Sequence, residues 1–302
     1  MQRKLVKQGN NALTVTLPAQ WLQERNLKAG DVVEIEEEEN RLILAGKGKP
    51  NRQTITIILP RSLSANLMRI KLSNAYKKGY DFIIVQFENN SVFKEIEKIS
   101  RNLIGFEVVD ISEKRCTLRN ISIELESEYE LLFKKSFYLL KENMQKTQEG
   151  IEQNSFKRGL EIREYRDIIT RYADYVKRIF NKNLRSRDTC IFEYLIVRDL
   201  EKISNEIYYL YNHLENSELK SFDKTKGVVK LTFETVEEMF SSYFRKNVSY
   251  LETFVKRKDN FMDKELQILL KDHKMDHQII LRCAKIMRRC QDIVGPFYAV
   301  YL

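Results

Sequence analysis

The N-terminal fold is decided by the stretch Gly9-Asn10-Asn11-Ala12-Leu13-Thr14-Val15-Thr16-Leu17-Pro18. Its apolar residues Leu13, Val15 and Leu17 alternate with threonines, which is the period of a strand with one buried face. Proline has no N–H to donate to a neighbouring strand, so Pro18 ends the run. The sequence therefore predicts a strand that reaches Pro18.

A short helix and a hairpin follow this strand. Residues 19–26 predict one or two helical turns, with Trp21 as an apolar contact. A polar turn at 36–41 is flanked on both sides by apolar residues, namely Val33, Ile35, Leu42 and Leu44. That pattern is typical of a β-hairpin.

These elements are too few to form a stable domain alone. Fewer than about fifty residues bury little apolar surface, and domains of that size usually need disulfides, metal or oligomerisation. No cysteine occurs before Cys116. We therefore expect a homodimer whose two chains share one β core.

The N-terminal pattern resembles that of the AbrB/SpoVT transcription-factor family over about Gln2 to Leu44. A basic first strand, V-x-L-P, an aromatic residue and L-x-x-G-D-x-V occur together and in order. The resemblance implies a swapped-hairpin dimer over residues 1–48 that binds duplex DNA through its strands and loops. The candidate DNA contacts are Arg3, Lys4, Lys7, Gln8, Asn10 and Asn11.

Two interpretations of these side chains stay open. Lysine and arginine neutralise phosphate, and glutamine and asparagine hydrogen-bond to base edges. Alternatively, Arg3, Lys4 and Lys7 form the solvated face of an edge strand, where lysine discourages unwanted pairing. The acidic run Glu36 to Glu39 offsets much of the positive charge of this segment, so steering toward DNA requires the hairpin tip to point away from it.

Composition sets broad limits on the whole chain. Its 302 residues leave room for two or three domains, and a net charge of +9 is compatible with an anionic partner or with lysine-rich helix surfaces. We find no apolar run of membrane-spanning length and no signal peptide, and expect a cytoplasmic protein without membrane insertion. The scattered cysteines are expected to be reduced core residues; they are Cys116, Cys190, Cys283 and Cys290.

Beyond a turn-rich linker at 46–50, the chain predicts an α+β fold with two further domains. A small α/β coupling domain over 51–124 has the order β-α-β-α-β-β, at 54–59, 63–78, 80–87, 92–102, 106–111 and 116–123. Right-handed crossovers would place its helices on one face of the sheet. An antiparallel helical bundle is expected over 126–302, with helices near 127–148, 155–182, 187–216, 226–258 and 262–294.

The segment Val197 to Ile207 resembles the signature helix of PhoU proteins, the helical-bundle regulators of phosphate uptake. Its matches to R-x-L-E-R-I-G-D-H are Arg198, Leu200, Glu201 and Ile203. Residues 75–83 and 103–109 look like the Y-x-x-G-Y-D-x-I and L-I-G-x-E motifs of archaeal PhoU-like proteins that carry an AbrB-type N-terminus. The resemblance therefore covers nearly the whole chain in order.

In that family, E-x-x-x-D pairs bind metal clusters, because carboxylates at i and i+4 reach a shared cation. The resemblance implies a divalent or iron-type metal at Glu201, Asn205 and Asp167. The ligand set is incomplete, since Asn205 occupies the aspartate position of the family and lacks its charge. Alternatively, Glu201 and Asn205 lie on a solvated helix face.

A second candidate metal site consists of His273 and His277. Their i, i+4 spacing on one helix face suits zinc, but no Glu follows the first His and charged residues surround both, which favours an exposed helix face. A basic cluster near the C-terminus is the other candidate binding feature, for phosphate, DNA or an acidic partner, or a solvated face; it consists of Arg282, Lys285, Arg288 and Arg289.

The sequence thus predicts a DNA-binding regulator of the phosphate-uptake type. Its AbrB-like dimer would read DNA, and its PhoU-like bundle would sense an effector or dock on a partner. The alternative is an adaptor that controls a phosphate transporter or a signalling partner by protein contact, with the N-terminal domain only dimerising. No Ser/His/Asp set, nucleotide loop or acid–base pair of carboxylates can be assembled, so no enzyme is expected.

Overall fold

A computed structural model describes residues 2–9, 12–24, 26–38, 41–46, 52–89, 91–122, 128–182, 189–217, 222–273 and 275–301. The chain divides into two compact units, Met1–Gln53 and Thr54–Leu302. The α/β segment and the long helices belong to the same unit. The predicted α+β class is confirmed.

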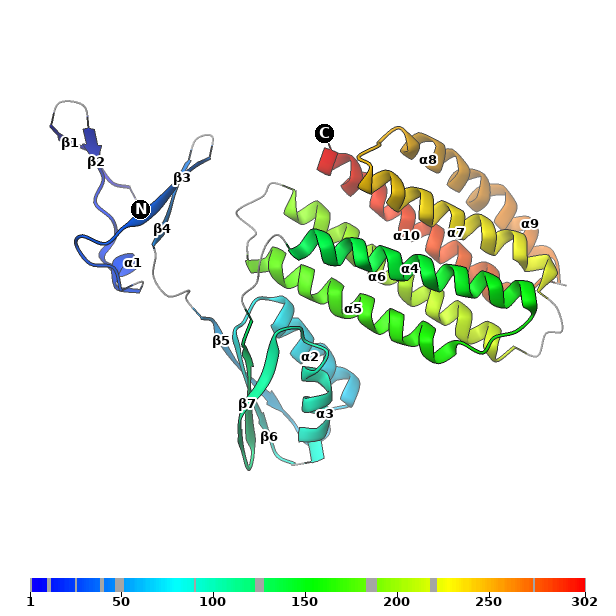
Figure 1. Ribbon diagram of the computed structural model, residues 1–302, viewed down its shortest axis with the longest axis horizontal. Coiled ribbons are helices and arrows are strands. Elements are labelled where there is room, and N and C mark those ends of the chain that lie inside the picture. The colour runs from blue at the N-terminus through cyan, green and yellow to red at the C-terminus, as the bar shows by residue number, and fades with distance from the viewer. Residues whose placement is uncertain are drawn as a thin grey trace. The chain divides into compact units, whose positions relative to one another are not determined.

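The first unit contains two separate hairpins and a short helix (Figure 1). Strand β1 (Val6–Gln8) pairs with β2 (Ala12–Thr14), and β3 (Val33–Glu38) pairs with β4 (Arg41–Gly46). Helix α1 (Ala19–Glu24) lies between them in the chain, as predicted. The predicted strand up to Pro18 is too long. Strand β2 ends at Thr14 because Thr14 pairs with Val6, the first residue of its only partner strand.

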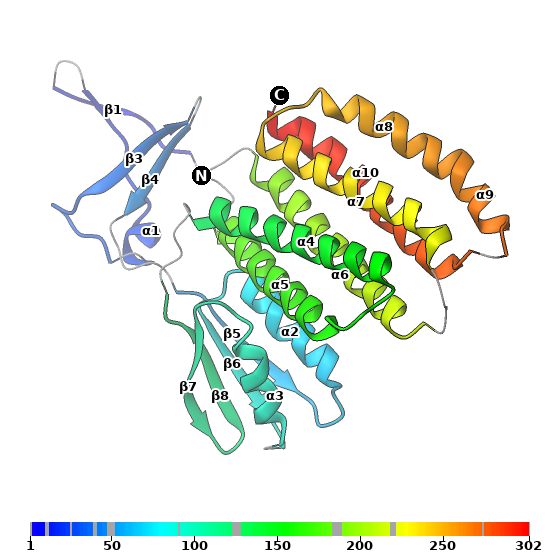
Figure 2. The same cartoon turned by 45° about the vertical axis from the view of Figure 1, so that its right-hand side comes forward.

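The α/β segment forms the predicted β-α-β-α-β-β order. Its elements are β5 (Thr54–Leu59), α2 (Ala65–Lys77), β6 (Phe82–Phe87), α3 (Ser91–Ser100), β7 (Phe106–Ser112) and β8 (Arg115–Asn120). The strands lie in the order β5-β6-β8-β7, with β5 parallel to β6 and the other two pairs antiparallel. Figure 2 shows α2 and α3 on one face of this sheet, as the crossover rule predicts.

Strand periodicity decides which side chains face these helices. In β6, Ile83, Val85 and Phe87 are buried, and the residues between them are more exposed. In β8, Leu118 lies opposite Ile83 and Cys116 lies opposite Val85, and both are fully buried. The helices and strands therefore enclose one apolar layer, continuous with the core of the helical region.

The rest of the chain is helical. Its elements are α4 (Glu128–Gln153), α5 (Gly159–Lys182), α6 (Cys190–Glu215), α7 (Asp223–Phe244), α8 (Tyr250–Asn260), a π-helical turn η1 (Phe261–Glu265), α9 (Leu266–Lys271) and α10 (His277–Tyr301). Helix α5 packs between α4 and α6, and α10 packs against α6 and α7 (Figure 1). No helix of the described ranges combines the length and apolarity that a membrane span requires.

Two predicted helices are broken. The predicted helix 226–258 is divided after Phe244, because Lys246 adopts a left-handed φ of 57° and its N–H donates to the carbonyl of Tyr243. The predicted helix 262–294 is divided at 272–276, where Asp276 Oδ1 accepts from the backbone N–H of Gln278 at 2.9 Å. Asp276 therefore starts α10 as an N-cap residue.

A buried arginine joins α5 to the α/β segment. Arg178 is fully buried, and its Nη1 donates to the carbonyls of Tyr76 and Tyr80 at 2.8 Å each. Its Nη2 lies 3.0 Å from Asp81 Oδ1, and the Lys182 Nζ lies 2.7 Å from the same oxygen. Since a buried charge must be paired and hydrogen-bonded, this set of contacts fixes the position of α5 against the sheet segment.

The turn that receives Arg178 requires a glycine. Gly79 has φ of 100° directly after α2, where the Gly79 N–H donates to the Tyr76 carbonyl at 3.0 Å. A Cβ at this position would lie 2.9 Å from Lys182 Cγ. Glycine is therefore needed both for the helix end and for the close approach of α5.

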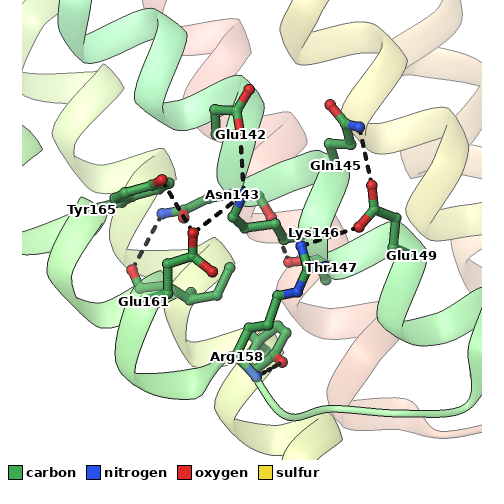
Figure 3. A network of polar contacts seen from close by, with 11 residues as sticks. Glu142, Asn143, Gln145, Lys146, Thr147, Glu149, Arg158, Glu161 and Tyr165 are labelled. Atoms are coloured by element: carbon green, nitrogen blue, oxygen red, sulfur yellow. Dashed lines mark hydrogen bonds and ion pairs between the residues drawn. The ribbon is translucent and has the colours of Figure 1, made fainter.

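The connected ends of α4 and α5 share a polar network (Figure 3). Lys146 Nζ lies 3.1 Å from Glu142 and 3.4 Å from Glu161, and Tyr165 donates to Glu161 at 3.2 Å. The fully buried Asn143 donates to the Ile162 carbonyl at 3.3 Å, which ties the helix backbones together below this surface network. These contacts hold α4 and α5 in register.

Candidate nucleic-acid interface

The first hairpin presents the candidate DNA contacts. The register of β1 and β2 places Lys7 opposite Leu13, and Gln8 opposite Ala12. Gly9 begins the connecting turn with φ of 69°, a conformation that glycine adopts without strain. The hairpin is further held by Thr14, whose hydroxyl donates to the Val6 carbonyl at 3.2 Å.

The structure brings the basic candidates together on this hairpin and on the chain that leads into it. Arg3, Lys4, Lys7 and Gln8 are all exposed. The two asparagine candidates, Asn10 and Asn11, lie outside the described residues. Three cationic side chains and one amide are thus available to a ligand.

The apolar side chains of the same unit are also uncovered. Among residues 2–46, none of the side chains that the structure describes is buried, and Trp21 is half-buried. Leu13 is 63% exposed and Leu42 is 68% exposed. Other large apolar residues there are exposed as well: Leu5, Val6, Val15, Val32 and Ile35. The strands have the apolar alternation of a buried face, but the described residues of this unit do not cover that face. The unit therefore lacks a core of its own.

The candidate metal ligands are each engaged by cations. The Glu201 carboxylate pairs with Lys177, and Asp167 lies 3.1 Å from Arg166 and 4.0 Å from Arg163. Asn205 is half-buried on α6. Among the residues that the structure describes, no group of three or more His, Cys, Asp or Glu side chains is placed to hold a metal ion.

The histidine pair does not share a helix face. His277 begins α10, whereas His273 lies in the break after α9, because Asp276 caps α10. The second Asp276 carboxylate oxygen lies 2.7 Å from His213 Nε2. The prediction that His273 and His277 occupy one helix at i and i+4 is therefore wrong.

The C-terminal basic cluster is partly neutralised. Arg282 Nη1 lies 2.7 Å from Glu206, and Arg289 Nη1 lies 3.1 Å from Asp292. Lys285 and Arg288 are exposed. Half of this cluster is thus engaged in ion pairs between and within helices.

Sequence reasoning did not find the ion pairs that connect α2, α5 and α6. Asp174 lies 3.5 Å from Lys77 and 3.6 Å from Lys177, and Lys177 also pairs with Glu201. Burial raises the pKa of Asp174, although both lysines oppose that shift. Burial lowers the pKa of Lys177, but Glu201 and Asp174 outweigh it and raise the pKa above its usual value. These ion pairs leave one signal in the sequence: the charged residues Asp174 and Lys177 interrupt the apolar stripe of α5.

The comparison with protein families matches the N-terminal unit. Residues 6–55 match the family model described as antidote-toxin recognition MazE, bacterial antitoxin. Neither a curated protein nor a solved structure matches the chain. The matched range contains the β1–β2 hairpin, α1 and the β3–β4 hairpin. The chain therefore carries an N-terminal domain of the MazE/AbrB type, which suggests a DNA-binding or antitoxin-type regulator.

Proposed function

We propose that the protein is a non-enzymatic transcription regulator that acts as a homodimer in the cytoplasm and binds DNA through its N-terminal unit. One observation carries the proposal. The unit that matches a MazE-type domain exposes basic and apolar side chains together, and none of its described side chains is buried.

The apolar side chains support the dimer. An isolated two-stranded hairpin is marginally stable in water, and this unit has two hairpins that are not hydrogen-bonded to each other. A second copy that interleaves its hairpins with these would cover Ile35, Leu42 and their neighbours. Full burial of each such side chain is worth about 1.5–3 kcal/mol, so several together stabilise a tight dimer.

The basic side chains support DNA as the ligand. A dimer presents Arg3, Lys4 and Lys7 twice, so up to six cations meet the phosphate backbone. Gln8 follows Lys7 on β1, so its side chain faces the other side of the hairpin, where its amide can hydrogen-bond to base edges. Phosphate contacts set the position and base contacts set the sequence preference.

The proposal that phosphate uptake is the regulated process rests on the PhoU-like motifs. In this proposal, the bundle responds to an effector and biases the dimer. Residues 76–83 of the first motif supply the carbonyls of Tyr76 and Tyr80 to the buried Arg178 of α5. A change in the helices would therefore reach the α/β segment directly.

An adaptor is the second candidate. The sheet face opposite α2 and α3 includes Ile58, an exposed apolar residue on the edge strand β5. A transporter or signalling protein that docks there would use the second unit alone. The N-terminal unit would then only dimerise.

DNA binding by the full chain separates these candidates. The probe is labelled DNA from the promoter of its own gene and from phosphate-transport promoters, with scrambled DNA as competitor, at two salt concentrations. We expect specific binding that weakens steeply with salt. In a plot of the logarithm of the binding constant against the logarithm of the salt concentration, each phosphate contact should steepen the slope by about one unit. Equal binding to scrambled DNA, or none, would overturn the regulator and favour the adaptor.

Matched variants make the test local. Replacing Arg3, Lys4 and Lys7 by alanine should abolish specific binding and flatten the salt dependence. The control replaces Arg61, Lys71 and Lys94, which carry the same charge, are exposed and lie in the second unit. Equal loss of binding in both triple variants would show that net charge alone, and not the hairpin, attracts DNA.

A further inference from the structure

A groove in the second unit lies between α2, the end of α3 and α5. Its volume is about 340 Å³. Five cationic side chains line it: Arg69, Lys98, Arg163, Arg166 and Arg171. Two carboxylates, Asp167 and Asp174, face the same space, which leaves three positive charges in excess.

One face of α5 supplies half of the residues that line it. Arg163, Arg166, Thr170 and Asp174 follow one another at intervals of three or four residues, and Asp167 and Arg171 are four residues apart. Residues at these spacings are neighbours on a helix surface. The helix that carries the predicted metal ligand Asp167 therefore presents mainly guanidinium groups to the groove.

The two carboxylates do not neutralise the groove. Asp174 is shared by Lys77 and Lys177, neither of which lines it. Asp167 is 49% exposed and pairs with Arg163 and Arg166. Within the described residues, Arg69, Lys98 and Arg171 have no carboxylate partner.

Two nitrogen atoms of the lining are buried and unpaired. The Nε atoms of Arg166 and Arg171 have no hydrogen-bond partner within the described residues. Buried donors in folded proteins are almost always paired, since an unpaired one costs about 1–3 kcal/mol. Each belongs to a guanidinium that lines the groove, but neither atom is itself open to it, so an acceptor in the groove would pair with one only after that guanidinium turns.

Arg166 is held ready for such an acceptor. Its guanidinium lies 4.5 Å from the centroid of the Tyr208 ring, and its Nη2 lies 3.1 Å from Asp167. Stacking and an ion pair fix the plane of the guanidinium and reduce the entropy that a ligand must remove. Arginine forks match the oxygen geometry of phosphate, which a lysine does not.

We propose that this groove is a binding site for a small phosphate-bearing ligand, either inorganic phosphate or a phosphate monoester. The volume lies in the range of small-molecule sites, about 300–1,000 Å³, so it admits an ester larger than phosphate itself. The excess of cations disfavours a metal ion at Asp167. The site does not depend on DNA binding by the N-terminal unit.

Calorimetric titration of the full chain tests the proposal. The probes are inorganic phosphate, adenosine 5′-monophosphate and adenosine. We expect the two phosphate-bearing probes to bind and adenosine to fail. A preference of tenfold or more between the first two identifies free phosphate or an ester as the ligand class. Absence of binding by both, or equal binding of adenosine and its monophosphate, would overturn the proposal.

Three variants place the binding in the groove. Arg171→Gln and Arg166→Gln remove a charged fork and should each weaken binding at least tenfold. Asp167→Asn removes a negative charge from the same lining and should tighten binding several-fold. A weakened Asp167→Asn variant with an unchanged fold by circular dichroism would contradict an anion site.

Arg61→Gln is the matched control. Arg61 is exposed in the turn after β5 and does not line the groove, so its replacement removes the same charge from another surface. Its affinity should equal that of the unmodified chain. A loss equal to that of Arg171→Gln would assign the binding to general charge and overturn the groove.

Discussion

The two units of the chain differ in how they cover apolar side chains. In the unit 54–302, one continuous core extends from the sheet of the α/β segment through the long helices. In the unit 1–53, no described side chain is buried, and Leu13 and Leu42 are almost two-thirds exposed. Both units carry strands with the alternation that a buried face requires.

This difference indicates where the stability of each unit comes from. The large unit forms its core within one chain, and even the charge of Arg178 is paired inside it. The small unit has the side chains of a core but nothing within its own described residues to cover them. If the proposed dimer supplies the missing cover, the stability of this unit comes from association and its unfolding should depend on protein concentration.

The largest expected effect concerns the buried arginine. Arg178→Met removes the guanidinium from Asp81, which keeps its ion pair with Lys182, and removes the donor from the carbonyls of Tyr76 and Tyr80. Removing one partner of a buried pair costs about 3–5 kcal/mol, and the remaining lysine places this case near 3 kcal/mol. Urea unfolding followed by circular dichroism measures the loss.

The exposed Arg61 is again the control, because surface substitutions usually change stability by less than about 0.5 kcal/mol. A loss below about 1 kcal/mol for Arg178→Met would show that the joint between α5 and the α/β segment adds little stability. The paired charge of Arg178 would then no longer count as a source of stability that the large unit has and the small unit lacks.

The second expected effect separates the units by their unfolding transitions. Trp21 is the only tryptophan and lies in α1 of the small unit, so its fluorescence reports on that unit. Tenfold dilution should lower the stability seen by tryptophan fluorescence by about 1.4 kcal/mol per dimer. The helical signal should not change with dilution. Coincident transitions at every concentration would show that the two units unfold together.

The smallest expected effect is a gain in stability at the break between α7 and α8. Lys246 adopts a left-handed conformation, which costs a residue with a side chain about 1–2 kcal/mol. Lys246→Gly should stabilise the large unit by about 0.5 kcal/mol, after the larger chain entropy of glycine is counted. Thermal unfolding measures it, and Lys246→Val should destabilise. A loss of stability on substitution by glycine would contradict the conformational explanation.

The elements of the α/β segment were predictable from the sequence because their signals are local. Tyr80 to Phe87 is a dense apolar run, and the residues of the 63–78 segment have helical spacing, so the observed bounds differ by at most a few residues. The breaks at Lys246 and Asp276 were missed because both depend on single capping interactions within otherwise helical sequence. No proline or glycine marks either break.

The candidate sites were predictable only in part. Exposure of Lys7 follows from its place on the edge strand β1, and Arg3 and Lys4 lie on the exposed chain that leads into it. Asp167 was a candidate metal ligand by family resemblance, and Arg166 and Arg171 lie close to it in the sequence. Their role as the lining of a cationic groove depends on Arg69 and Lys98, which lie far away in sequence and meet α5 only in the folded chain.

Sedimentation equilibrium of the full chain tests most directly whether the small unit pairs with a second copy. We expect a species of twice the 36.0 kDa chain mass for the unmodified protein. Ile35→Asp, which places a charge in the proposed shared core, should give the single-chain mass. Leu160→Asp, at an exposed apolar residue of the large unit, should leave the dimer intact. A single-chain mass for the unmodified protein, or an intact dimer with Ile35→Asp, would contradict the claim that the small unit completes its core by pairing.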